Sequence, residues 1–225
     1  MLILALLAGT SAAFALTEVL KLERSPVGRP RFTHVFSPTC GCSHATARFA
    51  LRLHHADRVT ATVVNADGTA VRTLASGRRQ AGPFVFRWDG RNDAGAVVPD
   101  GSYRLRLGFA NAGRTIVIPK TVRVDTQAPT VTLVHVTPRR LSPGATATVL
   151  FRVSEAARPL VLVDGTVAVR GPRAPAGTRS LTWPGTLRGR SLRAGVHVVT
   201  VRARDLAGNL SAPSTGMRVR VRPGR

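Results

Sequence analysis

The sequence predicts an all-β fold of two tandem β-sandwiches preceded by one N-terminal hydrophobic helix. Short stretches alternate between apolar and polar positions, and Gly, Asn, Asp and Pro interrupt them about every ten residues, which is typical of sandwiches. After residue 32 no stretch has the apolar period of an amphipathic helix. A length of 225 residues suits one to two domains, and a hydrophobic fraction of 44% is enough for packed cores.

The N-terminus predicts the hydrophobic helix, because Glu18 is the only charged residue before Lys21. We expect residues 1–21 to be a transmembrane helix or signal-anchor. That prediction makes the chain a single-pass membrane protein whose β-domains are extracytoplasmic. The alternative is a secreted protein whose signal peptide is cleaved near Ala15, where the sequence has the small-x-small pattern.

Two series of predicted strands follow a linker at residues 22–32, which contains two prolines and a glycine. The first series belongs to a unit at residues 33–126. A segment at 125–129 predicts a hinge, and the second series belongs to a unit at residues 127–225. The clearest strands of the first unit are expected at 58–64, 70–74, 83–88, 103–109 and 115–124.

Residues 88–103, WDGRNDAGAVVPDGSY, are the most constrained stretch of the sequence. An aromatic anchor and two turns lead through a corner at 99–101 into an alternating strand, which is a hairpin signature. Glycines follow Trp183 at nearly the same spacing as they follow Trp88. Because the motif is repeated, each half is expected to have its own core. Both tryptophans are predicted as core residues; the alternative is an exposed platform on which a sugar or base stacks. The residues of this structural motif are Asp67, Gly68, Trp88, Asp89, Gly90, Gly95, Pro99, Gly101, Tyr103, Trp183, Gly185 and Gly195.

Residues 59–125 resemble the FlgD-type Ig-like domain, a module named after the bacterial flagellar hook-capping scaffold. The shared pattern is the D-G turn at 67–68, V-R-T-L at 71–74, W-D-G at 88–90 and P-x-G at 99–101. The D-L-A-G-N sequence at 205–209 resembles a turn of bacterial surface Ig-like repeats. The resemblance implies a FlgD-type Ig-like domain at 33–126, a second, diverged Ig-like β-sandwich domain at 127–225, and a structural or docking role in a surface or envelope setting.

Cys40 and Cys42 are the only cysteines, and they stand where relatives of this domain have a turn rich in Asn and Asp. A disulfide is one interpretation, and Gly41 between them would allow the tight turn. Free or intermolecular thiols are another. The third is a metal site, because Cys40, Cys42 and His44 lie two residues apart on one face of an extended segment. A fourth metal ligand would come from His34, His54 or His55.

Asp89, Asn92, Asp93 and Asp100 lie close together in the sequence and suggest calcium. Their spacing does not fit an EF-hand, since Arg91 occupies the third ligand position. Turn residues that bond their own backbone explain the cluster instead. The sequence has no G-x-S-x-G and no phosphate-binding glycine loop, so we predict a non-enzymatic protein with no catalytic residues and no cofactor.

The charge of the chain is strongly positive, with 33 basic against 11 acidic residues and a formal net charge of +22. The arginines are scattered along predicted strands, so they form either solvated strand faces or a surface that binds anions. Only 5% of residues are aromatic, which disfavours nucleic acid as the partner.

The sequence therefore predicts a membrane-anchored, extracytoplasmic Ig-like scaffold or interaction module of the bacterial cell envelope. Its expected partners are the membrane, through the N-terminal helix, and a protein. Two alternatives remain open: a secreted module that positions substrate for an envelope hydrolase, and a binder of anionic cell-wall polymer through arginine-rich faces.

Overall fold

The computed structural model describes residues 25–223, and within this range the chain forms eighteen β-strands and no helix. The first eight strands are β1 (Val27–Phe32), β2 (Val35–Phe36), β3 (Ala47–Leu53), β4 (Asp57–Val64), β5 (Ala70–Arg79), β6 (Gly82–Trp88), β7 (Gly101–Phe109) and β8 (Arg114–Val124). The other ten are β9 (Val131–Thr137), β10 (Arg140–Leu141), β11 (Ala147–Val153), β12 (Arg158–Val163), β13 (Thr166–Arg170), β14 (Gly177–Trp183), β15 (Thr186–Leu187), β16 (Arg190–Ser191), β17 (Gly195–Arg204) and β18 (Met217–Val221).

The first eight strands form a β-sandwich of two sheets. One sheet has the order β2-β8-β7-β4-β5 and the other β1-β3-β6. All pairs are antiparallel except β2 and β8, which run parallel for two residues. The alternation of the sequence produces this packing directly: along β3 and β7 every second residue is buried, so each strand turns one face to the core.

The second half has the same topology. Its five-stranded sheet has the order β10-β18-β17-β12-β13, its three-stranded sheet the order β14-β11-β9, and β10 again pairs parallel with the last strand. The added element is the small hairpin β15-β16, which follows Trp183. The β-sandwich prediction is thus confirmed, and the two halves are structural copies of each other.

Each sandwich has its own hydrophobic core. The core of the first half surrounds Trp88, Phe36 and Phe49, and the core of the second surrounds Trp183 and Phe151; all five side chains are buried. Aromatic side chains of this size bury much apolar area, and together with the aliphatic residues around them they stabilise each half.

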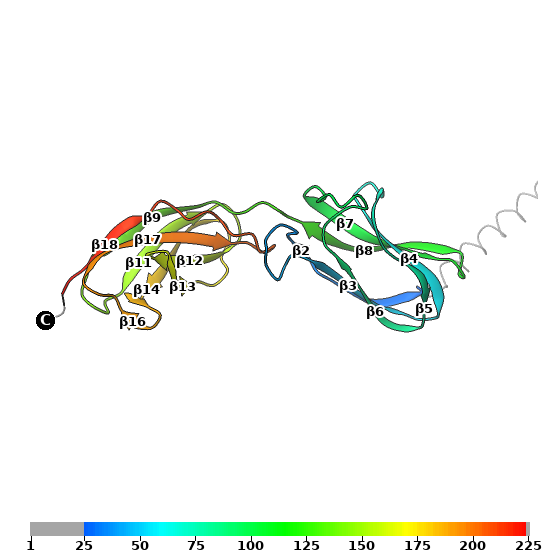
Figure 1. Ribbon diagram of the computed structural model, residues 1–225, viewed down its shortest axis with the longest axis horizontal. Helices are drawn as coiled ribbons and strands as arrows, with labels where there is room; N and C mark the ends of the chain where they lie inside the picture. The colour runs from blue at the N-terminus through cyan, green and yellow to red at the C-terminus, as the bar shows by residue number, and fades with distance from the viewer. Residues whose placement is uncertain (1–24, 224–225) are drawn as a thin grey trace, which may run out of the picture.

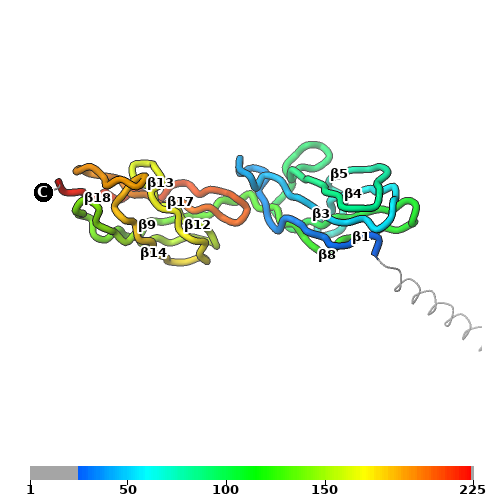
Figure 2. Tube along the Cα trace, turned by 90° about the horizontal axis from the view of Figure 1, so that it is seen from below, coloured from blue at the N-terminus to red at the C-terminus, as the bar shows by residue number. Residues whose placement is uncertain are grey.

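The two sandwiches lie end to end and give the molecule an elongated shape (Figure 1). The chain crosses between them once, at residues 125–130, and at this crossing a loop of the first sandwich faces a turn of the second. Both views show the loop after β2 and the turn after β17 meeting there (Figures 1 and 2).

Two predictions about the N-terminus require correction. The predicted fold class, an all-β fold with a preceding hydrophobic helix, is wrong in its helical part, since the structure describes strands alone and residues 1–21 lie outside the described range. The single-pass membrane localisation is also contradicted: between residues 25 and 223 no helix has the length and apolar character needed to span a bilayer. Short alternating strands dominate this part of the chain.

Candidate functional site

The Trp-Gly motif of the first sandwich is part of its core. The Trp88 side chain is buried, its Nε1 donates a hydrogen bond to the Arg91 carbonyl at 2.9 Å, and its ring packs edge-on against Tyr103 at a centroid distance of 5.0 Å. The Tyr103 hydroxyl in turn donates to the Pro99 carbonyl at 2.7 Å. These contacts leave neither ring exposed, so the structure favours the core interpretation over a stacking platform.

The second sandwich repeats this arrangement around Trp183. Its Nε1 donates to the Thr186 carbonyl at 2.9 Å, again three residues further along the chain. Gly185 follows with a φ of 63°, as Gly90 follows Trp88 with a φ of 73°. An added Cβ at Gly185 would collide with the Ala145 carbonyl oxygen, so the glycine is required by the approach of the neighbouring backbone.

His197 takes the place of Tyr103 in the second sandwich. The Tyr103 hydroxyl meets a carbonyl four residues earlier, and His197 Nε2 meets the Arg193 carbonyl, also four residues earlier, at 2.9 Å. The other ring nitrogen of His197, Nδ1, lies 2.7 Å from Asp164 Oδ2. Burial alone lowers the pKa of His197, but the hydrogen bonds to Asp164 and Arg193 and the negative charge of Asp164 together raise it.

The Asx cluster that suggested calcium is distributed over separate turns. Asp89 accepts from Arg91 N at 3.1 Å, Asn92 from Ala96 N at 2.9 Å, and Asp93 from Thr73 N at 3.1 Å. Asp100 accepts from both the backbone N and the hydroxyl of Thr126, at 2.8 and 2.9 Å. Asp89 and Asn92 therefore bond the backbone of their own turns, as expected, whereas Asp93 and Asp100 bond groups 20 and 26 residues away in the chain.

The Cys40–Cys42 pair forms a disulfide with its Cα atoms 5.2 Å apart. The two sulfurs are bonded to each other and offer no thiolate, so the candidate metal set of Cys40, Cys42 and His44 is not assembled here. His44 N donates to Cys42 Sγ at 3.4 Å, and the His44 ring lies beside Ser43. Of the other histidines considered, His54 contacts the Ser25 carbonyl at 2.9 Å, far along the chain from the cysteines.

The disulfide lies against the second sandwich, at the junction between the two halves. Gly208, in the D-L-A-G-N turn after β17, is so close that an added Cβ would be 2.5 Å from Cys42 Sγ and 3.4 Å from Cys40 Sγ. Gly208 also has a φ of 100°, a conformation that other residues rarely adopt. The loop with the two cysteines and the turn with Gly208 are therefore the facing surfaces of the junction.

Asn209 ties the same turn to the crossing chain. Its Nδ2 donates to the Asp125 carbonyl at 2.8 Å, to the Gln127 carbonyl at 3.1 Å and to Asp205 Oδ2 at 2.8 Å. Asp205 Oδ1 accepts from the backbone N of Gly208 and of Asn209, at 2.7 and 2.8 Å. Because Thr126 is held by Asp100 on the first sandwich, the segment predicted as a hinge is hydrogen-bonded to both halves.

The junction also brings together Asp125, Glu155 and Asp205, whose carboxylate oxygens lie within 4.8 Å of one another. Asp205 is satisfied by the turn, and Asp125 is bound by Arg123 Nη2 at 3.2 Å and by the backbone N of Gln127 at 3.3 Å. Burial raises the pKa of Glu155, the charges of Asp205 and Asp125 add to the rise, and Arg123 opposes it. These partners of Asp125 and Asp205 are groups of the protein itself, close to each of them along the chain.

The geometry of the first sandwich defines an Ig-like domain. Residues 37–113 match the family model of the FlgD Ig-like domain, so the FlgD-type resemblance predicted from the sequence is confirmed for this part of the chain. The match includes the loop with the two cysteines and the Trp88 hairpin.

Curated relatives match the same region. The basal-body rod modification protein FlgD of Salmonella typhimurium is 41% identical over 78 residues, which cover 34% of this chain and 34% of the relative. The FlgD of Escherichia coli is 37% identical over 78 residues with the same coverage. The chain thus spans about a third of the length of the curated relatives it matches.

Solved structures that match most of the chain are more distant. The fibronectin(III)-like modules of CbhA from Clostridium thermocellum have a TM-score of 0.45 and 18% identity, and the match covers 88% of this chain and 93% of theirs. The BSP domain of a biofilm associated protein has a TM-score of 0.30 and 19% identity, with 88% and 30% covered. Scores and identities this low carry no argument about function.

Proposed function

We propose that this protein is a non-enzymatic scaffold or interaction module of the bacterial cell envelope. It holds a protein partner with two Ig-like sandwiches whose relative orientation is fixed. The observation that carries the proposal is the junction. Asn209 bonds the crossing chain at Asp125 and Gln127, and Gly208 packs on the Cys40–Cys42 disulfide.

A fixed junction is what a scaffold needs. Two domains joined by a free linker lose orientational entropy when a partner binds both, whereas a rigid pair has lost it on folding. Here the groups that fix the junction are themselves buried, since Asp205, Asn209 and Asp125 are each less than a tenth exposed. Buried hydrogen bonds of this kind are costly to break, because opening the junction leaves polar groups without their partners.

Two further observations support the proposal. A disulfide persists in an oxidising compartment, which fits a protein of the envelope. The matching curated relatives are rod modification proteins of the flagellar basal body, and we carry over from them only the general role of a module that acts on an assembly of other proteins.

The experiment is crosslinking of the full chain to its partner in cells, with a photoreactive residue at exposed Thr121 on the first sandwich or Thr182 on the second. We expect both positions to crosslink to the same protein, and Asn209→Ala to reduce the yield at both. The matched control is Asn111→Ala, which changes an exposed turn asparagine of the first sandwich. Crosslinking that is unaffected by Asn209→Ala, or crosslinking to different proteins at the two positions, would contradict a scaffold whose two sandwiches have a fixed relative orientation.

A further inference from the structure

A row of arginines crosses the outer face of the five-stranded sheet in the second sandwich. In this sheet β18 lies between β10 and β17, and the register places Arg220 directly beside Arg140 on one side and Val196 on the other. Arg218, two residues before Arg220, faces the same side of the sheet and pairs with Val198. Both valines are exposed, at 52% and 40%.

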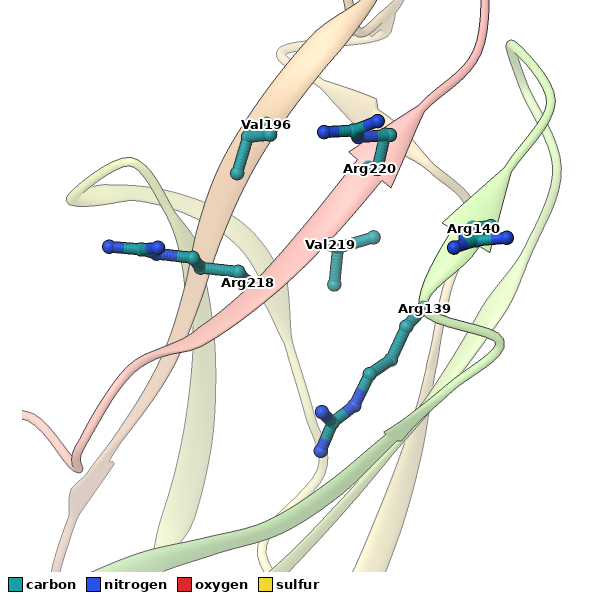
Figure 3. Close-up of a pocket in the computed structure, with 6 residues that line it drawn as sticks. All are labelled: Arg139, Arg140, Val196, Arg218, Val219 and Arg220. Atoms are coloured by element: carbon teal, nitrogen blue, oxygen red, sulfur yellow. The ribbon is translucent and has the colours of Figure 1, made fainter.

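These residues surround a shallow hollow of about 320 Å³, which we call the arginine hollow. Figure 3 shows Arg218 and Arg220 projecting from β18 on the side of Val196, with Arg139 and Arg140 on the other side of that strand. The lining consists of Arg139, Arg140, Val196, Arg218, Val219 and Arg220, so every polar side chain in it is a guanidinium.

Between residues 25 and 223, no carboxylate neutralises the positive charges of the hollow. Residues 127–225 contain 16 arginines and only three acidic residues, Glu155, Asp164 and Asp205. Glu155 and Asp205 lie at the junction, and Asp164 pairs with His197. Among the described residues, none of the four arginines of the hollow forms an ion pair with a carboxylate.

This arrangement carries a cost for the folded chain. Like charges directly opposite each other on neighbouring strands are destabilising, and Arg140 and Arg220 form such a pair. A scattered set of solvated arginines would avoid this repulsion, but the register of β10, β18 and β17 brings them together. An anion in the hollow would convert the repulsion into charge-assisted hydrogen bonds.

We infer that the arginine hollow binds a linear polyanion through its phosphate groups. A guanidinium presents a planar fork that pairs with two phosphate oxygens, and a phosphate has enough oxygens to meet forks from two strands. Arg220 lies two residues after Arg218 on β18, so their Cα atoms are about 6.6 Å apart along the strand. The two side chains therefore present successive charges along a line. A chain of phosphates supplies successive negative charges in the same way.

A polymer without bases fits the hollow better than a nucleic acid. Proteins that bind single strands stack the bases on aromatic rings, and the hollow offers only arginine and valine. Exposed Val196 provides apolar contact for the carbon atoms of a polymer repeat. β18, which carries Arg218 and Arg220, lies toward the end of the second sandwich that points away from the first (Figure 1), so the hollow is separate from the groups that form the junction.

The experiment is calorimetric titration of the full chain with inorganic polyphosphate at several salt concentrations. We expect binding that weakens steeply with salt, since each arginine–phosphate contact releases counterions. The variant Arg140→Gln/Arg218→Gln/Arg220→Gln should bind at least about tenfold more weakly, and the slope of log K against log salt should fall by about three. Arg220→Lys alone, which keeps the charge and loses the fork, should already weaken binding.

The matched control removes the same number of charges from scattered, exposed positions, as Arg78→Gln/Arg152→Gln/Arg173→Gln. This control should weaken binding by no more than about threefold, because it changes the long-range field and no contact. Equal losses for the two triple variants would overturn the inference, as would absence of binding at low salt. Tighter binding of a single-stranded oligonucleotide than of polyphosphate would overturn it in favour of nucleic acid, and tighter binding of polyglutamate in favour of a carboxylate polymer.

Discussion

The side-chain amide of Asn209 donates a 2.8 Å hydrogen bond to the backbone carbonyl of Asp125, a residue 84 positions earlier in the chain. Asp125 ends the first sandwich and Asn209 belongs to the last long turn of the second. This bond, with those to Gln127 and Asp205, converts the crossing between two Ig-like sandwiches into a fixed junction.

Asn209→Ala should therefore destabilise the protein and loosen the junction. The substitution leaves the Asp125 carbonyl and Asp205 Oδ2 without a donor in a buried place, which costs about 1–3 kcal/mol. Urea unfolding measures this loss. Asn111→Ala, at an exposed turn, should change the free energy of unfolding by less than about 0.5 kcal/mol, and equal effects of the two would contradict our account of Asn209.

Gly208→Ala should be more destabilising than Gly68→Ala. Both glycines have positive φ, 100° and 83°, so both substitutions carry the backbone strain of about 1–2 kcal/mol. Only at Gly208 does the new Cβ meet the Cys42 sulfur, and nothing lies within 4 Å of a Cβ at Gly68. Overpacking should add about 1–3 kcal/mol at Gly208. Thermal unfolding of the two variants gives the comparison, and a difference near zero would mean that the contact with the disulfide is loose.

Trp88→Phe and Trp183→Phe should each destabilise the protein by about 1–3 kcal/mol, through loss of the indole hydrogen bond and of packed volume. Because the two rings belong to separate cores, the effects should add in the double variant to within about 0.5 kcal/mol. Chemical unfolding of the two single variants and the double variant tests this. Strong non-additivity would show that the two cores are coupled.

The His197–Asp164 pair should make stability depend on pH. The two nitrogens of His197 face two acceptors, Asp164 Oδ2 and the Arg193 carbonyl, and only the imidazolium can donate to both. The pKa of His197 is raised, so its contribution is complete below the ordinary value of 6.5 and is lost as pH rises through the folded-state pKa.

The ionisation of Asp164 determines the low pH at which the His197–Asp164 pair stops contributing to stability. Burial alone would raise its pKa, but the hydrogen bonds from Val198 N and His197 and the charge of His197 together lower it. Its contribution is present above the ordinary value of 3.8 and is lost as pH falls through the lowered pKa. Thermal unfolding should thus show a stability loss that begins near the ordinary pKa of 6.5 and continues as pH rises above it. His197→Gln should abolish this loss, and His135→Gln, at an exposed strand position, should retain it. An unchanged pH profile in His197→Gln would contradict the assignment.

Sequence patterns predict local structure well in this chain. The spacing of tryptophan and glycine identifies both hairpins, and alternation locates most strands of both sandwiches, because each depends on contacts between residues close in sequence. The FlgD-type resemblance follows from the same residues. The spacing after each tryptophan also aligns Tyr103 with His197, but the contact that both side chains make, with a carbonyl four residues earlier, has no signal in the sequence. Alternation does not predict β1, which lies inside the predicted linker at 22–32.

The junction and the arginine hollow could not be found in this way. Asn209 meets Asp125, and Gly208 meets Cys42, only after both sandwiches have folded and docked. The hollow depends on the register that aligns Arg140 with Arg220 across two strands 80 residues apart. Tertiary register of this kind has no local signal, although the D-L-A-G-N turn contains three residues of the junction, Asp205, Gly208 and Asn209.

Pulsed electron-paramagnetic resonance measures the fixed junction most directly, with spin labels at Thr121→Cys on β8 and Thr182→Cys on β14, both exposed positions, while the Cys40–Cys42 disulfide stays closed. We predict a single narrow distance distribution for the otherwise unchanged chain and a broadened one when Asn209→Ala is added. A broad distribution before Asn209 is changed would contradict the fixed junction and, with it, the proposed scaffold.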